Sequence, residues 1–410
     1  MNLVDFLNNS PTSYNAIDSI KKILDKNDYK ELRESEEYSI EKGNKYYITR
    51  NDSSIIAFNI GDGDNYHLEL TASHSDCPSF VLKPNSTIYE NGYLKLNTEP
   101  YGGLILYTWL DRPLSIAGRL IYKENGEVKS MPYKYDKPFC IIPSLAIHLN
   151  REINSNLTLN PQVDLMPMVS LEKGDIKSFL KEETNKEVIS YDLYLYPINS
   201  AYTWGKNDEF ITGQHLDDLQ CAYNCLMGFV NNFKSDNINV YCCFDNEEIG
   251  SSTRQGADSD FLFNNLNRIC NSLNIDYYRL LANGYMLSCD NAHGLHPNHA
   301  EKYDSTNRTY INKGIVLKHE TRSYTSDGLS MGLFTNLLDE NNIPYQFFAN
   351  KSDSRGGSTL GNISNNHSSL LSLDIGLPQL AMHSCVETAG NIDNEYMIKA
   401  IKAFYSTHLN

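Results

Sequence analysis

The chain has 410 residues, of which 40% are hydrophobic, and it includes 28 tyrosines and 15 phenylalanines. This apolar content can fill a packed core, so the composition excludes a largely disordered protein. The formal net charge is −16 at pH 7 and Lys and Arg never form a run longer than two, which argues against a nucleic-acid partner. The length predicts two domains, or one domain with a large insertion.

The N-terminal segment predicts a cytoplasmic protein. It has no basic stretch followed by an apolar block, and no apolar stretch of the chain approaches membrane-spanning length, so we expect no membrane partner. The nine cysteines are odd in number and lack CxxC spacing. We therefore expect reduced, mostly buried thiols, with neither disulfides nor cysteine-type zinc sites.

Several predicted strands lead directly into polar clusters. Alternating apolar and β-branched residues predict strands at 53–61, 66–74, 238–244, 285–289 and 371–382. The last four of these end on the carboxylate or imidazole groups of His74, Asp245, Asp290 and His383. Ligand sites of open α/β sheets lie at the carboxyl ends of strands, so we expect a catalytic cleft where these ends meet.

Helical patterns alternate with the strands and predict an α/β fold with a sheet covered on both faces. These helices are expected at about 217–233, 258–273, 327–341 and 394–408.

The stretch from 85 to 204 differs from the rest of the chain. It contains short strand-like runs and turn residues such as Asn91-Gly92. We therefore predict a catalytic domain made of residues 1–84 plus 205–410, interrupted by a separate β-rich domain at 85–204.

A metal pair that activates water needs several carboxylates and imidazoles, and an unligated carboxylate to accept the proton of the water. His74 is a candidate ligand, with Asp76 holding its other ring nitrogen, although an isolated HxD is more often a polar strand end. Asp217 and Asp218 begin a predicted helix, where carboxylates also serve as N-caps.

Glu247 and Glu248 follow a buried strand. Adjacent residues of an extended backbone point in opposite directions, so one carboxylate can bind metal while its neighbour holds the attacking water. The alternative is a solvated acidic turn, but Gly250 and the preceding apolar run favour a tight, partly enclosed turn.

Three more candidate sites have equally ordinary interpretations. Asp290, His293 and His296 lie before Pro297, and at most one of them need be a ligand, since polar residues also close turns. A single histidine after an apolar strand, such as His383, is more often a hydrogen-bonded core residue. Only the combined set predicts a metal centre.

Eight segments of the chain resemble, in order, the aspartyl aminopeptidase family. The resemblance extends from about residue 4 to the C-terminus, and the ordered set is far more specific than any one motif. The segments are HSDCPSFVLKP, YGGLILYTWLDRPLSIAGR, IPSLAIHLNREIN, HLDDL, FDNEEIGSSTRQGA, DNAHGLHPN, GGSTLG and DIGLPQLAMHSCVET.

The resemblance implies a zinc-aminopeptidase α/β core interrupted by a β-rich dimerisation domain. It also implies a homo-oligomer in which six dimers form a tetrahedral dodecamer with its active sites facing an internal chamber. Each subunit would hold two divalent metal ions, most often Zn²⁺. Mixed oxygen and nitrogen ligation suits Co²⁺ or Mn²⁺ as well, so the sequence does not name the metal.

The resemblance also assigns roles to the candidate residues named above. Glu247 is the implied base, which takes a proton from water attacking the first peptide carbonyl and passes it to the leaving amine. Asp76 supports this catalytic site. Asp217 is the implied bridging ligand, His74 and Asp290 bind opposite metals, and Glu248 and His383 complete the two sites. The substrates are peptides with a free N-terminus.

Some positions depart from the family pattern. His215 and Asp218 stand in HLDD where the family has Arg and Asn, so Asp218 competes with Asp217 as the bridge. We retain Asp217, and a strained or cis peptide bond there would be typical of such a site. Ser144 and Gly356 stand where His and Cys are expected.

The family preference for N-terminal Asp or Glu requires a cation in the side-chain pocket, and Lys318 is the matching candidate, with Tyr324 beside it. A solvated surface lysine is the alternative. The spacing of Arg322-Ser323-Tyr324 is one residue shorter than in the family, so a preference for neutral residues stays open. His148 of the insertion is expected to reach the site of a neighbouring subunit.

Two other functions use the same features. A related two-metal amidase or deacylase would need the same water-activating pair, and only the substrate pocket would differ. A catalytically inactive, self-assembling shell or binding protein is the second rival. The many close carboxylates argue against the inactive shell, because they repel one another unless cations neutralise them.

Overall fold

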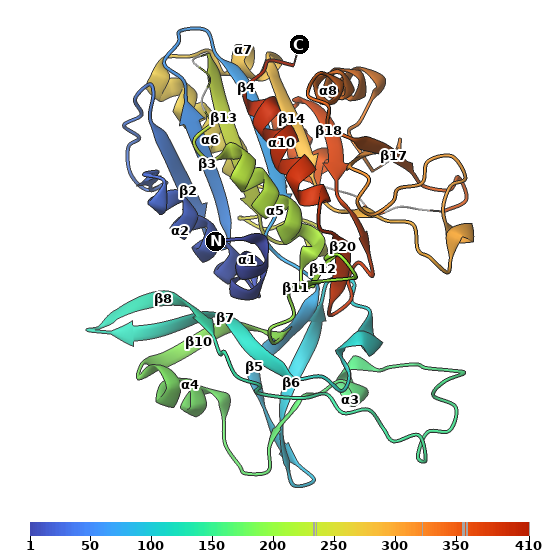
Figure 1. The fold of residues 1–410 in the computed structure, drawn as a ribbon. Helices are drawn as coiled ribbons and strands as arrows, with labels where there is room; N and C mark the ends of the chain where they lie inside the picture. Colours follow the sequence, from blue (N-terminus) through green and yellow to red (C-terminus); the bar gives the residue numbers. More distant parts are fainter. Residues whose placement is uncertain (233, 235, 322, 355–356, 358–359, 410) are drawn as a thin grey trace.

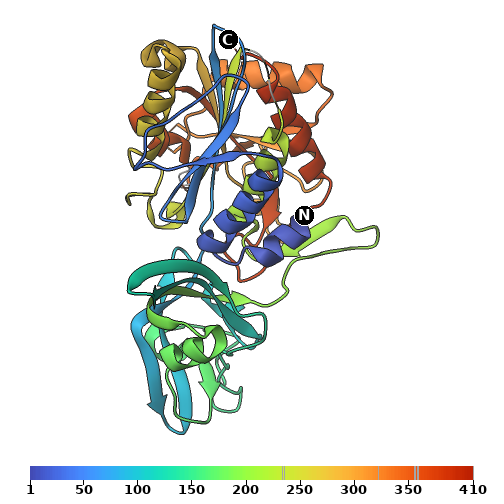
Figure 2. The ribbon, with the colours of Figure 1, turned by 90° about the vertical axis from the view of Figure 1, so that its left-hand side faces the viewer.

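The computed structural model covers residues 1–410 and describes all of them except 233, 235, 322, 355–356, 358–359 and 410. Two lobes are visible, a larger one that contains both chain termini and a smaller one built from about residues 79–197 (Figures 1 and 2). The fold is mixed α/β, as predicted.

The larger lobe is built around a mixed sheet. Among the described residues nine strands form it, in the order β1-β2-β3-β13-β4-β14-β18-β16-β17. Strands β13, β4, β14 and β18 are parallel neighbours, so their carboxyl ends lie at one edge. The strands are β1 (Lys30–Leu32), β2 (Lys45–Arg50), β3 (Ser54–Ile60), β4 (His67–His74), β13 (Asn237–Phe244), β14 (Gly284–Cys289), β16 (Ile315–His319), β17 (Tyr345–Ala349) and β18 (Leu371–Gly376).

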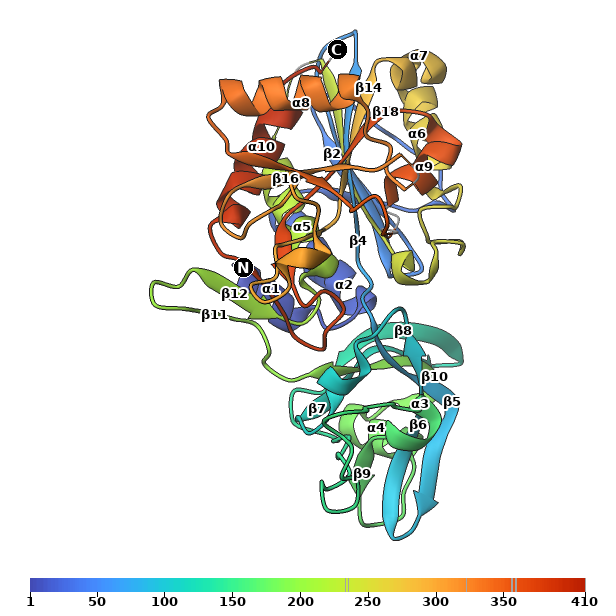
Figure 3. The same ribbon diagram turned by 90° about the vertical axis from the view of Figure 1, so that its right-hand side faces the viewer.

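Helices cover both faces of this sheet, as Figure 3 shows. The face with the larger core carries α1 (Leu3–Asn9), α2 (Ser13–Lys26), α5 (Leu216–Phe229), α8 (Gly328–Glu340) and α10 (Asp393–Tyr405). The other face carries α6 (Phe261–Leu273), α7 (Tyr277–Ala282) and α9 (Leu360–Ser368). The four predicted helices correspond to α5, α6, α8 and α10, although residue 233 of the first prediction lies outside the described residues.

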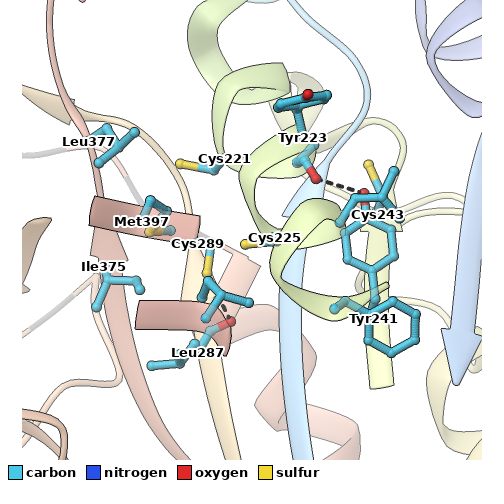
Figure 4. Packing of buried hydrophobic residues seen from close by; sticks show 14 of the residues in the cluster. Cys221, Tyr223, Cys225, Tyr241, Cys243, Leu287, Cys289, Ile375, Leu377 and Met397 are labelled. Carbon is cyan, nitrogen blue, oxygen red and sulfur yellow. Dashed lines mark hydrogen bonds between the residues drawn. The ribbon is translucent and has the colours of Figure 1, made fainter. Parts of the chain in front are cut away.

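Strand β13 shows why the central strands read as continuous apolar runs. All eight of its residues are buried. Val240 and Cys242 pack into the core under α6, whereas Tyr241 and Cys243 pack into the core under α5, because successive side chains of a strand point to opposite faces. The Tyr241 hydroxyl donates a hydrogen bond to the backbone oxygen of Ala222 in α5, at 3.1 Å (Figure 4).

The nine cysteines are all free and buried, as predicted. Figure 4 shows Cys221 and Cys225 of α5 near Cys289 of β14, inside the core. In the part of the chain that the structure describes, none of the helices combines the length and apolar character that crossing a membrane requires.

The smaller lobe contains an antiparallel sheet of six strands among the described residues, in the order β8-β7-β10-β5-β6-β9. Its core includes Trp109 and lies under helix α4. The predicted turn at Asn91-Gly92 joins β5 to β6, and both residues have positive φ. The elements are β5 (Ser79–Glu90), β6 (Tyr93–Tyr101), η1 (Leu106–Trp109), β7 (Leu114–Glu124), β8 (Glu127–Lys134), α3 (Pro161–Asp164), β9 (Met168–Ser170), α4 (Ile176–Thr184) and β10 (Glu187–Pro197).

Strand β5 runs through residue 85, the predicted start of the insertion. On the strand pairing we propose that the insertion begins at about Ser79 and ends soon after Pro197. The division of the chain into a core interrupted once by a β-rich domain stays a prediction from the sequence.

A third sheet, which the sequence did not reveal, lies between the two lobes. Among the described residues it has the order β11-β12-β20-β19-β15. Its strands are β11 (Tyr202–Trp204), β12 (Phe210–Gly213), β15 (Ala292–His293), β19 (Pro378–Leu380) and β20 (Glu387–Gly390).

The prediction of a single strand over 371–382 is wrong. The run divides into β18 of the large sheet and β19 of the third sheet, so His383 does not end a strand of the core. The change occurs at Gly376, where a Cβ atom would lie 1.9 Å from the backbone oxygen of Asp290. Only glycine permits this close approach of two backbones, which bends the chain out of the large sheet.

Candidate metal centre

Three strands of the large sheet deliver polar residues to one cleft. His74 is the last residue of β4, Glu247 and Glu248 follow β13, and Asp290 follows β14. Asp245, which the sequence placed at the end of β13, does not line the cleft. The cleft has a volume of about 430 Å³ and the following lining residues: His74, Asp217, Glu247, Glu248, Gly250, Asp290, Asn291, Ala292, His293, Lys318, Tyr324, Phe348, Gly357, Met382 and His383.

Three overlapping groups of side chains in this cleft have potential ligand atoms within 4.8 Å of one another. Asp217 and Glu248 each belong to two of the groups. The groups are His74 with Asp217 and Asp290, Asp217 with Glu248 and His383, and His74 with Glu247 and Glu248. All five residues predicted as metal ligands therefore come together.

Asp217 lies between the two histidines. Its Oδ1 is 3.3 Å from Nε2 of His74, and its Oδ2 is 3.5 Å from Nε2 of His383. His383 Nε2 also lies 3.5 Å from Oε2 of Glu248. This is the arrangement that a bridging carboxylate requires.

Both histidines direct Nε2 into the cleft. Nδ1 of His74 lies 3.0 Å from the backbone oxygen of Asp76, and Nδ1 of His383 lies 2.9 Å from the backbone oxygen of Gly103. A carbonyl oxygen can only accept, so Nδ1 carries a proton and Nε2 is the nitrogen that a metal ion would take. Ordered this way, the two imidazoles are suited to bind metal.

Two buried carboxylate oxygens in the cleft, Oδ1 of Asp217 and Oε1 of Glu248, lack a hydrogen-bond partner among the described residues. Burial and the adjacent Asp217 charge raise the pKa of Glu248 well above its usual range. Burial opposes protonation of His383, but Asp217 and Glu248 outweigh it and raise its pKa to about 10. A divalent cation would neutralise this crowded charge, and the imidazole and carboxylate donors fit zinc.

Asp76 lies behind the cleft rather than in its lining. Its carboxylate accepts hydrogen bonds from the backbone N–H groups of Glu247, at 3.0 Å, and Glu248, at 3.2 Å. Its Oδ1 is 3.5 Å from Nδ1 of His74, and its Oδ2 accepts from the hydroxyl of Tyr101 at 2.7 Å. Asp76 thus holds the backbone of Glu247 and Glu248 and the ring of His74 in place.

The prediction of an extended backbone at Glu247 and Glu248 is wrong. The pair begins a 3₁₀ turn, η2 (Glu247–Ile249), which Asn246 enters with a φ of 65°. Both carboxylates line the cleft instead of pointing to opposite sides. Burial raises the pKa of Glu247 to about 8, with Asp290 and Asp76 adding to the effect.

The Asp217–Asp218 peptide bond is cis. The two carboxylates have different surroundings. Asp217 belongs to two of the three ligand groups, whereas Oδ2 of Asp218 accepts a hydrogen bond from the backbone N–H of His74 and Asp218 belongs to none of them. His215, the other departure in this segment, is buried and precedes α5 with a φ of 60°.

Lys318 is 2% exposed, so it is not a solvated surface lysine. Its Nζ donates to the backbone oxygen of Asn291 at 2.8 Å and lies 3.6 Å from Oδ2 of Asp290. The ammonium also lies 5.6 Å from the centre of the Tyr324 ring. Burial opposes its charge, but Asp290 outweighs burial and raises the pKa of Lys318.

The remaining predicted residues lie elsewhere. His148 is exposed in an irregular loop of the smaller lobe and does not line the cleft of its own chain. The backbone N–H of Ser144 donates to Asp111 at 2.8 Å within that lobe. Arg322 and Gly356 lie outside the described residues. His293 lines the cleft but, like His296, belongs to none of the ligand groups found among the described residues.

Two residues that hold this centre were not predicted from the sequence. The Glu387 carboxylate accepts hydrogen bonds from the backbone N–H groups of Asp217, at 3.0 Å, and His383, at 2.6 Å. Tyr101, from the smaller lobe, donates to Asp76. Both occur inside segments that resemble the family, but nothing in their spacing marks them as part of a site.

A family model described as aminopeptidase I zinc metalloprotease (M18) matches residues 6–405. The chain belongs to the M18 aminopeptidase family. It is 46% identical to the probable M18 family aminopeptidase 2 of Clostridium novyi (strain NT), over 98% of this chain and 98% of that protein. The corresponding protein of Clostridium acetobutylicum is 41% identical, with the same coverage of both chains.

Solved structures with closely similar folds include Ape4 and Ape1 chains. A chain from "Cryo-EM structure of the Ape4 and Nbr1 complex" matches with a TM-score of 0.94 and 32% identity, over 98% of this chain and 84% of that one. A chain from "Structure of S. cerevesiae mApe1 dodecamer" matches with a TM-score of 0.86 and 27% identity, over 98% and 95%. The protein is thus a metallo-aminopeptidase of the zinc metalloprotease class.

Proposed function

We propose that this M18 aminopeptidase removes acidic N-terminal residues from peptides, using two divalent metal ions, Zn²⁺ by family and donor set, and Glu247 as general base. The observation that carries the proposal is the set of ligand groups that share Asp217 and Glu248 and enclose one cleft with Glu247. Each ligand group could hold one cation, so the overlap of the groups is what supports a pair of cations.

In the proposed centre Asp217 would bridge the two metals, and it is preferred to Asp218 because it lies between both histidines. The ligand groups favour His74 and Asp290 around one metal and Glu248 and His383 around the other. This assignment replaces the expectation that His74 and Asp290 bind opposite metals. Bound metals would polarise the scissile carbonyl and lower the pKa of water.

Glu247 performs the proton transfer in this proposal. Its carboxylate lines the cleft, and its backbone is fixed by the hydrogen bond from its N–H to Asp76. It takes the proton of the attacking water and delivers it to the leaving amine. Asp76 contributes by holding this turn and the His74 ring in place.

Lys318 and Tyr324 form the proposed pocket for the substrate side chain, since both line the cleft. An ammonium has three N–H donors, and the Lys318 contacts that the structure describes are with Asn291 and Asp290. At least one donor can therefore meet the carboxylate of an N-terminal Asp or Glu. If the Asp290 carboxylate neutralised the Lys318 ammonium completely, the pocket would prefer substrates with a neutral N-terminal residue.

We also propose that the chain assembles as a tetrahedral dodecamer, through its smaller lobe as dimerisation domain, and that His148 reaches the cleft of a neighbouring subunit. The likeness to the mApe1 dodecamer supports the assembly. Exposed apolar side chains in the loop that contains His148, namely Leu145, Ile147 and Leu149, support contact with a partner. Nine unpaired cysteines fit the proposed cytoplasmic location.

A panel of anilides tests the proposed specificity. Free Asp-, Glu- and Leu-anilides are compared with their N-acetylated forms, alongside elemental analysis of the purified protein. We expect turnover of the free acidic substrates, loss of turnover on acetylation, and two metal ions per chain. Faster turnover of the Leu substrate would replace the acidic preference by a neutral one, and equal turnover of acetylated substrates would indicate an amidase or deacylase.

A further inference from the structure

Strand β6 of the smaller lobe ends at Tyr101, which reaches the carboxylate behind the metal centre. Its hydroxyl donates to Oδ2 of Asp76 at 2.7 Å and accepts from Nδ2 of Asn246 at 2.8 Å. The same carboxylate accepts the backbone N–H groups of Glu247 and Glu248. One tyrosine of the insertion is therefore connected, through Asp76, to the turn that carries the proposed base and a proposed ligand.

The residues after Tyr101 contact the same centre. A Cβ atom at Gly102, which has a φ of +72°, would lie 3.1 Å from Cβ of Glu248. The backbone oxygen of Gly103 faces Nδ1 of His383, and the backbone N–H of Ile105 donates to the backbone oxygen of His383 at 3.0 Å. Segment 101–105 thus packs against the two proposed ligands Glu248 and His383. It belongs to the smaller lobe rather than to the catalytic core.

We propose that Tyr101 is a positioning residue of the metal centre, which fixes the Asp76 carboxylate and thereby the Glu247–Glu248 turn and the His74 ring. The inference rests on the proposed function, because it assumes that His74 and Glu248 bind metal. It makes the inserted lobe a working part of the active site in its own chain, in addition to any role in assembly.

The effect of removing the Tyr101 hydroxyl depends on the burial of Asp76. Asp76 is 4% exposed, so a carboxylate oxygen that loses the Tyr101 donor cannot recover it from bulk water. The carboxylate is then free to rotate toward its remaining donors, which displaces the amides of the turn. Loss of such supporting hydrogen bonds typically lowers metal affinity or activity about 10–100-fold.

Tyr101 itself does not line the cleft. Together with Asp76 and Tyr194 it lines a separate small cavity of about 10 Å³. The Tyr101 ring is held by Tyr194, with ring centroids 5.6 Å apart. A Tyr101→Phe variant therefore keeps the ring in place and removes only the hydroxyl, without altering the surface that meets the substrate.

The test compares Tyr101→Phe with Tyr196→Phe in the purified, metal-loaded enzyme. Tyr196 is a matched control, since it is buried in the same sheet and its hydroxyl donates to the backbone oxygen of Tyr135 at 2.7 Å, away from the cleft. The measurements are zinc transfer to a colorimetric chelator, the thermal unfolding midpoint, and kcat and KM on the best unblocked anilide.

For Tyr101→Phe we expect zinc affinity and kcat to fall about tenfold, at the low end of the range for such supports, with KM unchanged. Tyr196→Phe is expected to lower only the thermal midpoint. Equal zinc transfer and equal kcat in Tyr101→Phe and wild type would overturn the inference, as would equal losses in both variants, which would indicate a general packing effect. An inactive wild type would refute the proposed function separately, because zinc transfer does not depend on turnover.

Discussion

At the scale of single residues, Glu247 differs from the other acids of the cleft in the role proposed for it. It lies beside His74 and Glu248, but the proposed bridging position belongs to Asp217. Its backbone is held by Asp76, so the side chain can be altered without moving the turn.

Replacement of Glu247 by Gln should therefore separate proton transfer from metal binding. The amide has the same shape but cannot accept a proton at neutral pH, so kcat should fall by about 10²–10⁴-fold while metal content stays near that of the wild type. Steady-state kinetics and elemental analysis measure the two effects. The comparison variant His383→Ala should lose metal as well, and a Gln variant with normal kcat would refute the role of Glu247.

Glu69 of β4 provides a pH-dependent prediction away from the metal centre. Its side chain is 1% exposed, and its Oε2 lacks a hydrogen-bond partner among the described residues. Burial raises its pKa well above the usual range, although the backbone N–H of Leu409 opposes this shift. The folded chain therefore holds a proton that the unfolded chain releases above its usual pKa, so this group destabilises the fold as pH rises.

Glu69→Gln should accordingly raise the free energy of unfolding at pH 8 and have a smaller effect at pH 5. The reason is that the amide stays neutral at both values, whereas the carboxyl of the wild type must stay protonated against the rising pH. Urea denaturation at the two pH values measures the difference. Exposed Glu182→Gln is the control, and the same gain in both variants would contradict a burial effect.

At the scale of elements, the separation of β18 from β19 places two parts of the site. Strand β18 continues the large sheet beside β14, and β19 pairs with β20, which carries Glu387. The close approach of Gly376 to the backbone of Asp290 lets one chain segment serve both sheets.

Gly376→Ala should lower the free energy of unfolding by about 1–3 kcal/mol, because the new methyl group would overlap the Asp290 carbonyl, which is rigid backbone. Gly332→Ala provides a matched control with the opposite sign. Gly332 is exposed within α8 and a Cβ there meets nothing within 4 Å, so alanine should stabilise the helix by about 1 kcal/mol. Chemical denaturation of both variants measures the two effects, and equal stability of Gly376→Ala and wild type would show that the backbones can separate.

At the scale of the whole molecule, the smaller lobe has two surfaces with different expected roles. One surface holds the metal centre through Tyr101 and Gly103. The other presents exposed apolar side chains in the loop around His148, and a solvated monomer would not favour such a loop.

Leu149→Asp should disrupt the proposed dodecamer. Leu149 is 75% exposed, so its replacement should leave the fold intact while placing a charge in an apolar contact. Light scattering should give the mass of twelve chains for the wild type and a smaller assembly for the variant, with unchanged secondary structure by circular dichroism. Tyr278→Asp, at a side chain 78% exposed on α7, should keep the wild-type mass. A monomeric wild type would contradict the assembly.

Much of the fold and part of the site could be predicted from the sequence alone. Short apolar runs marked β4, β13 and β14, and the ends of β4 and β14 identified His74 and Asp290, because a strand and the residue after it are neighbours in the chain. The helices α5, α6, α8 and α10 followed from the same kind of local pattern. The ligand roles came from ordered resemblance to a family, not from spacing.

Only the tertiary structure decided how distant residues meet. Asp217 and Glu387 are separated by 170 positions, and Tyr101 and Asn246 by 145, so no local period records their hydrogen bonds. The 3₁₀ turn at Glu247 likewise depends on backbone contacts with other segments. The same holds for Gly376, where the chain leaves the large sheet for the third sheet. Local patterns encode which face a side chain takes, whereas a site built from several segments is determined by the packing that brings their backbones together.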